Sequence, residues 1–153
     1  MRELQHISDF LCRVRRKLRF GEFSREPLQL LRLEWKVELL ECDWLMRPAD
    51  PFDSELPRHL VDEHQTQQAL RDALSLRDVV FKSFPGVNTA ELRMFRTGAD
   101  ERPELMMTGS VNRTNEALAR VPSVAMRARL CGFNFNLAQG VLERMSPVSA
   151  ACS

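Results

Sequence analysis

The chain has 153 residues, of which 44% are hydrophobic and 28% charged, a composition typical of one globular domain. Its 22 basic and 21 acidic residues leave a net charge of +1, so no overall field favours nucleic acid or membrane as a partner. The sequence contains no apolar run near the roughly 20 residues that span a bilayer, and no secretory signal is expected at its N-terminus. Four widely spaced cysteines predict free thiols and a cytoplasmic protein: Cys12, Cys42, Cys131 and Cys152.

The first 25 residues predict an amphipathic helix and a linker. Apolar residues recur at helical spacing at Ile7, Phe10, Leu11, Val14 and Leu18. Five cations lie within seven positions of this helix: Arg13, Arg15, Arg16, Lys17 and Arg19. Gly21 follows where a helix would end, and the negative end of a helix dipole favours cations there.

After Pro27 the spacing of the apolar residues changes to two, which is typical of half-buried strands. One alternating run covers residues 31–37 and a second covers 40–46, so we interpret the pair as a β-hairpin. A continuous helix over residues 28–47 is the alternative, because no Gly or Pro interrupts this stretch and it is rich in good helix formers.

The middle of the chain predicts a stiff loop and then a long helix. Residues 47–57 contain three prolines, which exclude regular structure. A helix is expected from about His59 to Phe84, with an apolar face that packs against a sheet. Its opposite, polar face is expected to carry Glu63, Gln67, Arg71, Asp72, Asp78 and Lys82.

The second half of the chain begins with another predicted hairpin. Its strands cover residues 90–95 and 105–111, and the turn-rich residues 98–103 join them. Residues 114–120 predict a short helical turn or a loop. These local patterns repeat the arrangement of a helix followed by two strands.

The C-terminal residues predict a short helix and a last strand. Ser123 is placed to cap the helix at its start, and Gly132 is placed to end it. A fifth strand is expected at residues 133–137, and residues 141–145 predict either a short strand or a helical turn.

Together these elements predict an α+β fold. We expect an antiparallel sheet of about five strands, formed by two hairpins and a C-terminal strand, packed on the central amphipathic helix. Residues 1–25 would form the basic N-terminal helix and linker, residues 26–146 a single domain, and residues 147–153 a flexible tail. This order loosely resembles that of type III secretion chaperones, small α+β proteins that bind partners and catalyse nothing. The strand near Phe133 departs from that topology, and no residues can be matched.

The loop after the first hairpin is the best candidate for a partner-binding surface. It combines a proline-stiffened backbone with aromatic, basic and acidic residues, namely Trp44, Arg47, Asp50, Phe52 and Asp53. The alternative is structural: Arg47 would pair with Asp50 or Asp53, and the two aromatic residues would fill the core.

The basic N-terminal helix is a second candidate. Its cations would suit an anionic membrane surface, the phosphates of a nucleic acid or an acidic protein. The alternative is that its apolar residues pack on the domain and leave the cations in water. No aromatic residues alternate with the cations, so binding of single-stranded nucleic acid is not specifically indicated.

Catalytic patterns are weak in this sequence. His59 and His64 are five positions apart, about 140° around a helix, whereas zinc-binding pairs need a spacing of four. A metal-dependent hydrolase using His59, Glu63, Asp50 and Asp53 is therefore the third hypothesis. The leading prediction is a non-catalytic adaptor, chaperone or complex subunit that binds a protein partner and needs no cofactor. The sequence does not predict its oligomeric state.

Overall fold

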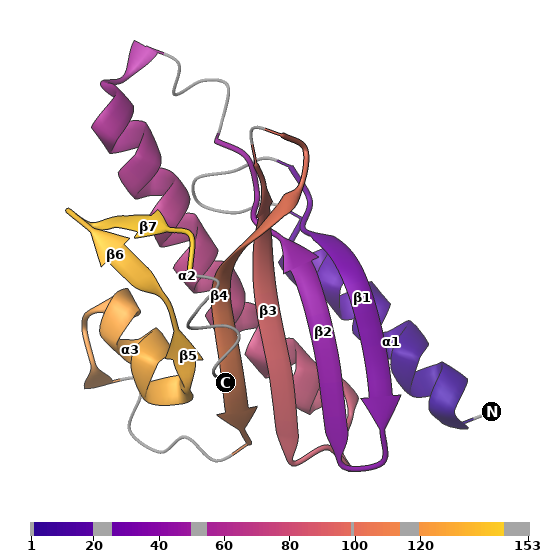
Figure 1. Cartoon of the computed structure of the whole chain (residues 1–153). Helices are drawn as coiled ribbons and strands as arrows, with labels where there is room; N and C mark the ends of the chain where they lie inside the picture. Colours follow the sequence, from indigo (N-terminus) through magenta and orange to yellow (C-terminus); the bar gives the residue numbers. More distant parts are fainter. Residues whose placement is uncertain (1, 20–25, 50–54, 99, 114–119, 146–153) are drawn as a thin grey trace.

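Figure 1 shows the computed structural model, which describes residues 2–19, 26–49, 55–98, 100–113 and 120–145. These residues form an α+β fold with three helices, a five-stranded sheet and a two-stranded hairpin. The elements are α1 (Arg2–Lys17), β1 (Gln29–Lys36), β2 (Leu39–Leu45), α2 (Arg58–Ser83), β3 (Thr89–Thr97), β4 (Pro103–Asn112), α3 (Val124–Cys131), β5 (Phe133–Asn134), β6 (Asn136–Ala138) and β7 (Val141–Glu143). Among the described helices, none has the length and apolar character needed to cross a membrane.

The sheet is mixed, and this corrects the prediction of a purely antiparallel one. Its strand order is β1-β2-β3-β4-β5. Both predicted hairpins are confirmed as antiparallel pairs, but β2 and β3 run parallel at the centre. The cause is α2, which carries the chain back along the sheet so that β3 starts at the same end as β2.

The core lies between the sheet and the helices α1 and α2, which share one face of the sheet (Figure 1). Because successive side chains of a strand point to opposite faces, alternate residues of β2 and β3 enter this core. They are fully buried: Leu40, Cys42, Trp44, Ala90, Leu92 and Met94. From α1, the apolar residues Phe10, Val14 and Leu18 join the same cluster.

The central helix is enclosed on more than one side, whereas the sequence predicted one buried and one solvated face. Beyond the sheet and α1, it also contacts α3 and β7 (Figure 1). Polar residues are therefore buried along with the apolar ones, among them Gln68, Asp72, Arg77 and Ser83. Asp72 was expected on the solvated face, but only 2% of it is exposed.

The C-terminal strand is shorter than predicted. Phe133–Asn134 pairs with β4 as β5, and the chain then leaves the sheet to form the separate β6–β7 hairpin. Gln139 and Gly140, both with positive φ, make its two-residue turn. The predicted cap of α3 is confirmed, since the side chain of Ser123 accepts a hydrogen bond from the backbone N–H of Met126. The predicted tail and residues 114–119 lie outside the described residues.

An arginine from the sheet fixes the end of α2. Arg113, which follows β4, donates hydrogen bonds to the backbone carbonyls of Phe81, Phe84, Pro85 and Val87 at 2.8, 2.9, 3.1 and 2.6 Å. Phe81 lies in the last turn of α2, where a helix runs out of internal donors, and the other three carbonyls belong to the segment that follows the helix. Arg113 therefore ties the C-terminal end of α2 to the end of β4.

Val37, in the β1–β2 turn, combines an exposed β-branched side chain with a positive φ of 32°. This conformation is strained for a β-branched residue, whereas asparagine tolerates it. We expect Val37→Asn to raise the free energy of unfolding by about 1 kcal/mol in urea titrations. Val37→Thr, which keeps the branch, should leave stability unchanged. A loss of stability in the asparagine variant would contradict this explanation.

Candidate functional site

A cleft lies at the edge of the sheet where the parallel strands β2 and β3 both end. Its volume is about 410 Å³, within the usual range of ligand-binding pockets. The start of β1, the segment after β2, the first half of α2 and the end of β3 all contribute to it. The lining residues are Glu26, Pro27, Gln29, Leu45, Met46, Arg47, Pro48, Ala49, Gln65, Arg96 and Thr97.

The wall after β2 is held from two directions. The backbone N–H of Met46 donates to the carbonyl of Phe95 at 2.7 Å, which continues the β2–β3 ladder past the end of β2. The Gln65 side chain donates from Nε2 to the carbonyl of Arg47 at 2.9 Å, which joins the same segment to α2. Pro48 adds a fixed backbone angle. The wall is therefore rigidly placed.

A buried ion pair lies directly beneath this wall. Arg47 donates from Nη2 to Asp72 Oδ1 at 3.1 Å, and its Nε is 2.9 Å from Asp72 Oδ2. Gln68 donates to the same carboxylate at 2.8 Å. The Arg47 Nη1 donates to the carbonyl of Glu26 at 3.2 Å. One guanidinium thus joins three parts of the cleft: the segment before β1, the segment after β2, and α2.

Burial dominates the electrostatics of this pair. It raises the pKa of Asp72 to about 6, although Arg47 and Gln68 act in the opposite direction. Burial also lowers the pKa of Arg47. The cost of removing the two charges from water therefore exceeds their mutual attraction, which is common for ion pairs in protein interiors. The pair positions the cleft wall at a cost in stability.

The raised pKa of Asp72 predicts a pH dependence. A carboxyl group whose folded-state pKa is above its ordinary value of 3.8 contributes stability below that value, and this contribution is lost as the pH rises through about 6. A double variant, Arg47→Met with Asp72→Leu, lacks this titration. We expect wild type to gain about 2–3 kcal/mol relative to the double variant between pH 7 and pH 4, measured by urea unfolding. Parallel pH profiles would contradict the assignment.

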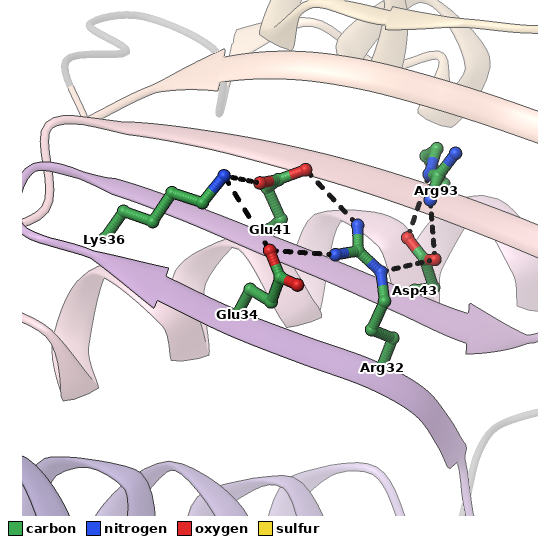
Figure 2. Close-up of polar contacts among 6 residues, drawn as sticks. All are labelled: Arg32, Glu34, Lys36, Glu41, Asp43 and Arg93. Atoms are coloured by element: carbon green, nitrogen blue, oxygen red, sulfur yellow. Dashed lines mark hydrogen bonds and ion pairs between the residues drawn. The ribbon is translucent and has the colours of Figure 1, made fainter.

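The outer face of the sheet carries a network of six charged side chains (Figure 2). Asp43 accepts hydrogen bonds from Arg93 at 2.8 and 3.0 Å and from Arg32 at 3.1 Å, and only 9% of its side chain is exposed. The network continues through Glu34, Glu41 and Lys36. The hydrogen bond that Arg32 donates to Asp43 is the main cause of the raised pKa of Arg32. Three cations and three carboxylates satisfy each other here, so this face offers little unpaired charge to a partner.

Of the five residues predicted to form the partner-binding loop, the structure describes Trp44 and Arg47. Trp44 is fully buried and Arg47 is 3% exposed, so these two side chains act from the interior. Arg47 pairs with Asp72 on α2 where the sequence suggested Asp50 or Asp53. Asp50, Phe52 and Asp53 lie outside the described residues. Sequence reasoning missed Asp72, Gln65 and Arg96, because contacts between distant elements leave no local pattern.

The cations of α1 remain on the surface while its apolar residues are buried. Arg15, Arg16, Lys17 and Arg19 are exposed, and half-buried Arg13 donates to the Ser83 hydroxyl at 3.2 Å. The nearby ammonium of Lys82 is the main cause of a lowered pKa at Lys17. The basic surface therefore extends from α1 onto α2.

Of the residues suspected of metal chemistry, the structure describes His59 and Glu63. Among the described residues, no group of three His, Cys, Asp or Glu side chains is close enough to hold a metal. His59 is exposed at the start of α2, while Asp50 and Asp53 lie outside the described residues. Burial raises the pKa of Cys42 to about 12 and also raises that of Cys131, so both thiols stay protonated at neutral pH.

The sequence matches no known protein family, and neither a curated protein nor a solved structure shows significant similarity to it. The function must therefore be inferred from the geometry of this chain.

Proposed function

We propose that the chain is a non-catalytic protein-interaction domain, acting in the cytoplasm as an adaptor, chaperone or complex subunit. It binds an extended segment of a partner protein in the cleft at the ends of β2 and β3. The observation that carries this proposal is the Arg47–Asp72 pair, which is costly to bury and joins three parts of the cleft.

The surface of the cleft suits a protein segment. Pro27, Leu45, Pro48 and Ala49 supply apolar contacts for a side chain, and charged groups lie toward the ends. Such a combination of an apolar centre and polar margins is typical of protein interfaces. The two prolines reduce the entropy lost on binding, because their backbone is already restricted.

A peptide-display selection tests this function. Wild type and Ala49→Trp, which fills the cleft, are used as separate targets; Met126→Trp adds the same side chain on an exposed part of α3. We expect wild type and Met126→Trp to select the same peptides, and Ala49→Trp to bind them at least 10-fold more weakly. Equal affinity for all three proteins, or failure of wild type to enrich any peptide, would refute the proposal.

The basic surface of α1 favours a second candidate, binding of a nucleic acid or an anionic membrane surface. Its support is the exposed cations of α1 together with Lys82. Phe10, Val14 and Leu18 are buried in the core, so contact with a membrane would be electrostatic. Binding should then weaken steeply with salt and in the variant Arg15→Gln with Arg16→Gln. Salt-insensitive binding would reject this candidate.

A further inference from the structure

The two ends of the cleft carry opposite charges. Arg96 lines the end formed by β3, and Glu26 lines the end formed by the segment before β1. The cleft is therefore polarised, and a ligand that crosses it meets a cation at one end and a carboxylate at the other.

The guanidinium of Arg96 has donors to spare. Its Nη2 donates to Glu104 Oε2 at 2.8 Å, and no other hydrogen bond of this side chain is made within the described residues. The side chain is 43% exposed, so solvent and ligands can reach it. An arginine with two free adjacent donors is suited to bind a carboxylate in a bidentate manner.

Glu26 is held in place through its backbone. Its carbonyl accepts the hydrogen bond from buried Arg47 at 3.2 Å, while its side chain is exposed. The carboxylate of Glu26 makes no ion pair or hydrogen bond with the described part of the chain. It is therefore available to a basic group of a ligand.

The strand order places the two charged residues on opposite sides of β2. Arg96 belongs to β3, and Glu26 precedes β1, which pairs with the other side of β2. The apolar surface of Leu45, Pro48 and Ala49 lies between the ends.

We propose that the partner segment carries an acidic and a basic residue with an apolar residue between them. The acidic residue binds Arg96 and the basic residue lies at Glu26. This inference rests on the proposed function and specifies the chemistry of its ligand.

Peptide selection with charge-neutralised variants tests the proposal. We expect wild type to enrich peptides with the acidic–apolar–basic pattern. Arg96→Gln should bind them at least 10-fold more weakly and lose the preference for the acid, and Arg96→Lys should recover part of the affinity. Glu26→Gln should lose only the preference for the basic residue. Arg129→Gln, an equal change of charge on an exposed residue of α3, should behave as wild type.

The outcomes separate this inference from the proposed function. Some peptides could bind wild type but not Ala49→Trp, with an affinity that does not depend on their charged residues. Such peptides would overturn the inference and leave the cleft as the binding site. Peptides that also lose affinity for Arg129→Gln would show a general effect of charge and would equally overturn it. Peptides that bind Ala49→Trp as well as wild type would overturn both.

Discussion

Replacing Asp72 by leucine alone is expected to lower the free energy of unfolding by about 3–5 kcal/mol, because it leaves the buried guanidinium of Arg47 without an anion. Arginine cannot release its proton to escape this cost. Arg47→Met should be milder, since Asp72, whose pKa is already raised to about 6, can take up a proton instead. The two single variants are therefore expected to differ, with Asp72→Leu the less stable in urea unfolding at pH 7.

The double variant Arg47→Met with Asp72→Leu is expected to lie within about 1 kcal/mol of wild type, since apolar groups of similar size avoid the desolvation cost. It should nevertheless bind cleft peptides more weakly, because the link from Arg47 to the carbonyl of Glu26 is lost. A double variant less stable than wild type by several kcal/mol would show that the pair is net stabilising, and would contradict the conclusion that it is held at a cost in stability.

Arg113→Met is expected to lower the free energy of unfolding by about 2–4 kcal/mol, because four backbone carbonyls at the end of α2 lose a charged donor. Arg113→Lys keeps the charge but cannot reach all four carbonyls, so it should recover only part of the loss. The matched control is Arg102→Met, whose side chain is 86% exposed and which should change stability by less than about 0.5 kcal/mol.

Hydrogen exchange locates the effect of Arg113. In Arg113→Met, the amides of the last turn of α2 should exchange faster, with the largest change next to Phe84, whose N–H bonds to the carbonyl of Val80. Uniformly faster exchange over the whole chain, with no excess at the end of α2, would contradict a local role for Arg113.

Local patterns predicted the elements of this fold well. The helical spacing of Phe10, Val14 and Leu18 and the alternation in both hairpins are properties of short windows, and the structure has these elements in the expected order. The parallel pairing of β2 with β3 was not predicted, because no local pattern in either hairpin determines which of its strands pairs with the other hairpin. Because of this parallel pairing, β2 and β3 end on the same side of the sheet, and the cleft lies at these strand ends.

The candidate site was predicted only in part. The sequence singled out the segment after β2, and part of this segment lines the cleft. Asp72 was assigned to the solvated face of its helix, because the helical spacing cannot reveal that the segment after β2 brings Arg47 against this residue. Arg96 and Gln65 belong to different elements, and only the fold brings them to the same cleft.

Mapping a selected peptide onto the chain by NMR chemical shifts tests directly whether the cleft is the binding site. We expect the largest amide changes at Leu45, Met46, Gln65, Arg96 and Thr97, and we expect them to disappear in Ala49→Trp. Changes centred on the cations of α1 or on the outer face of the sheet, with the cleft amides unmoved, would contradict this expectation.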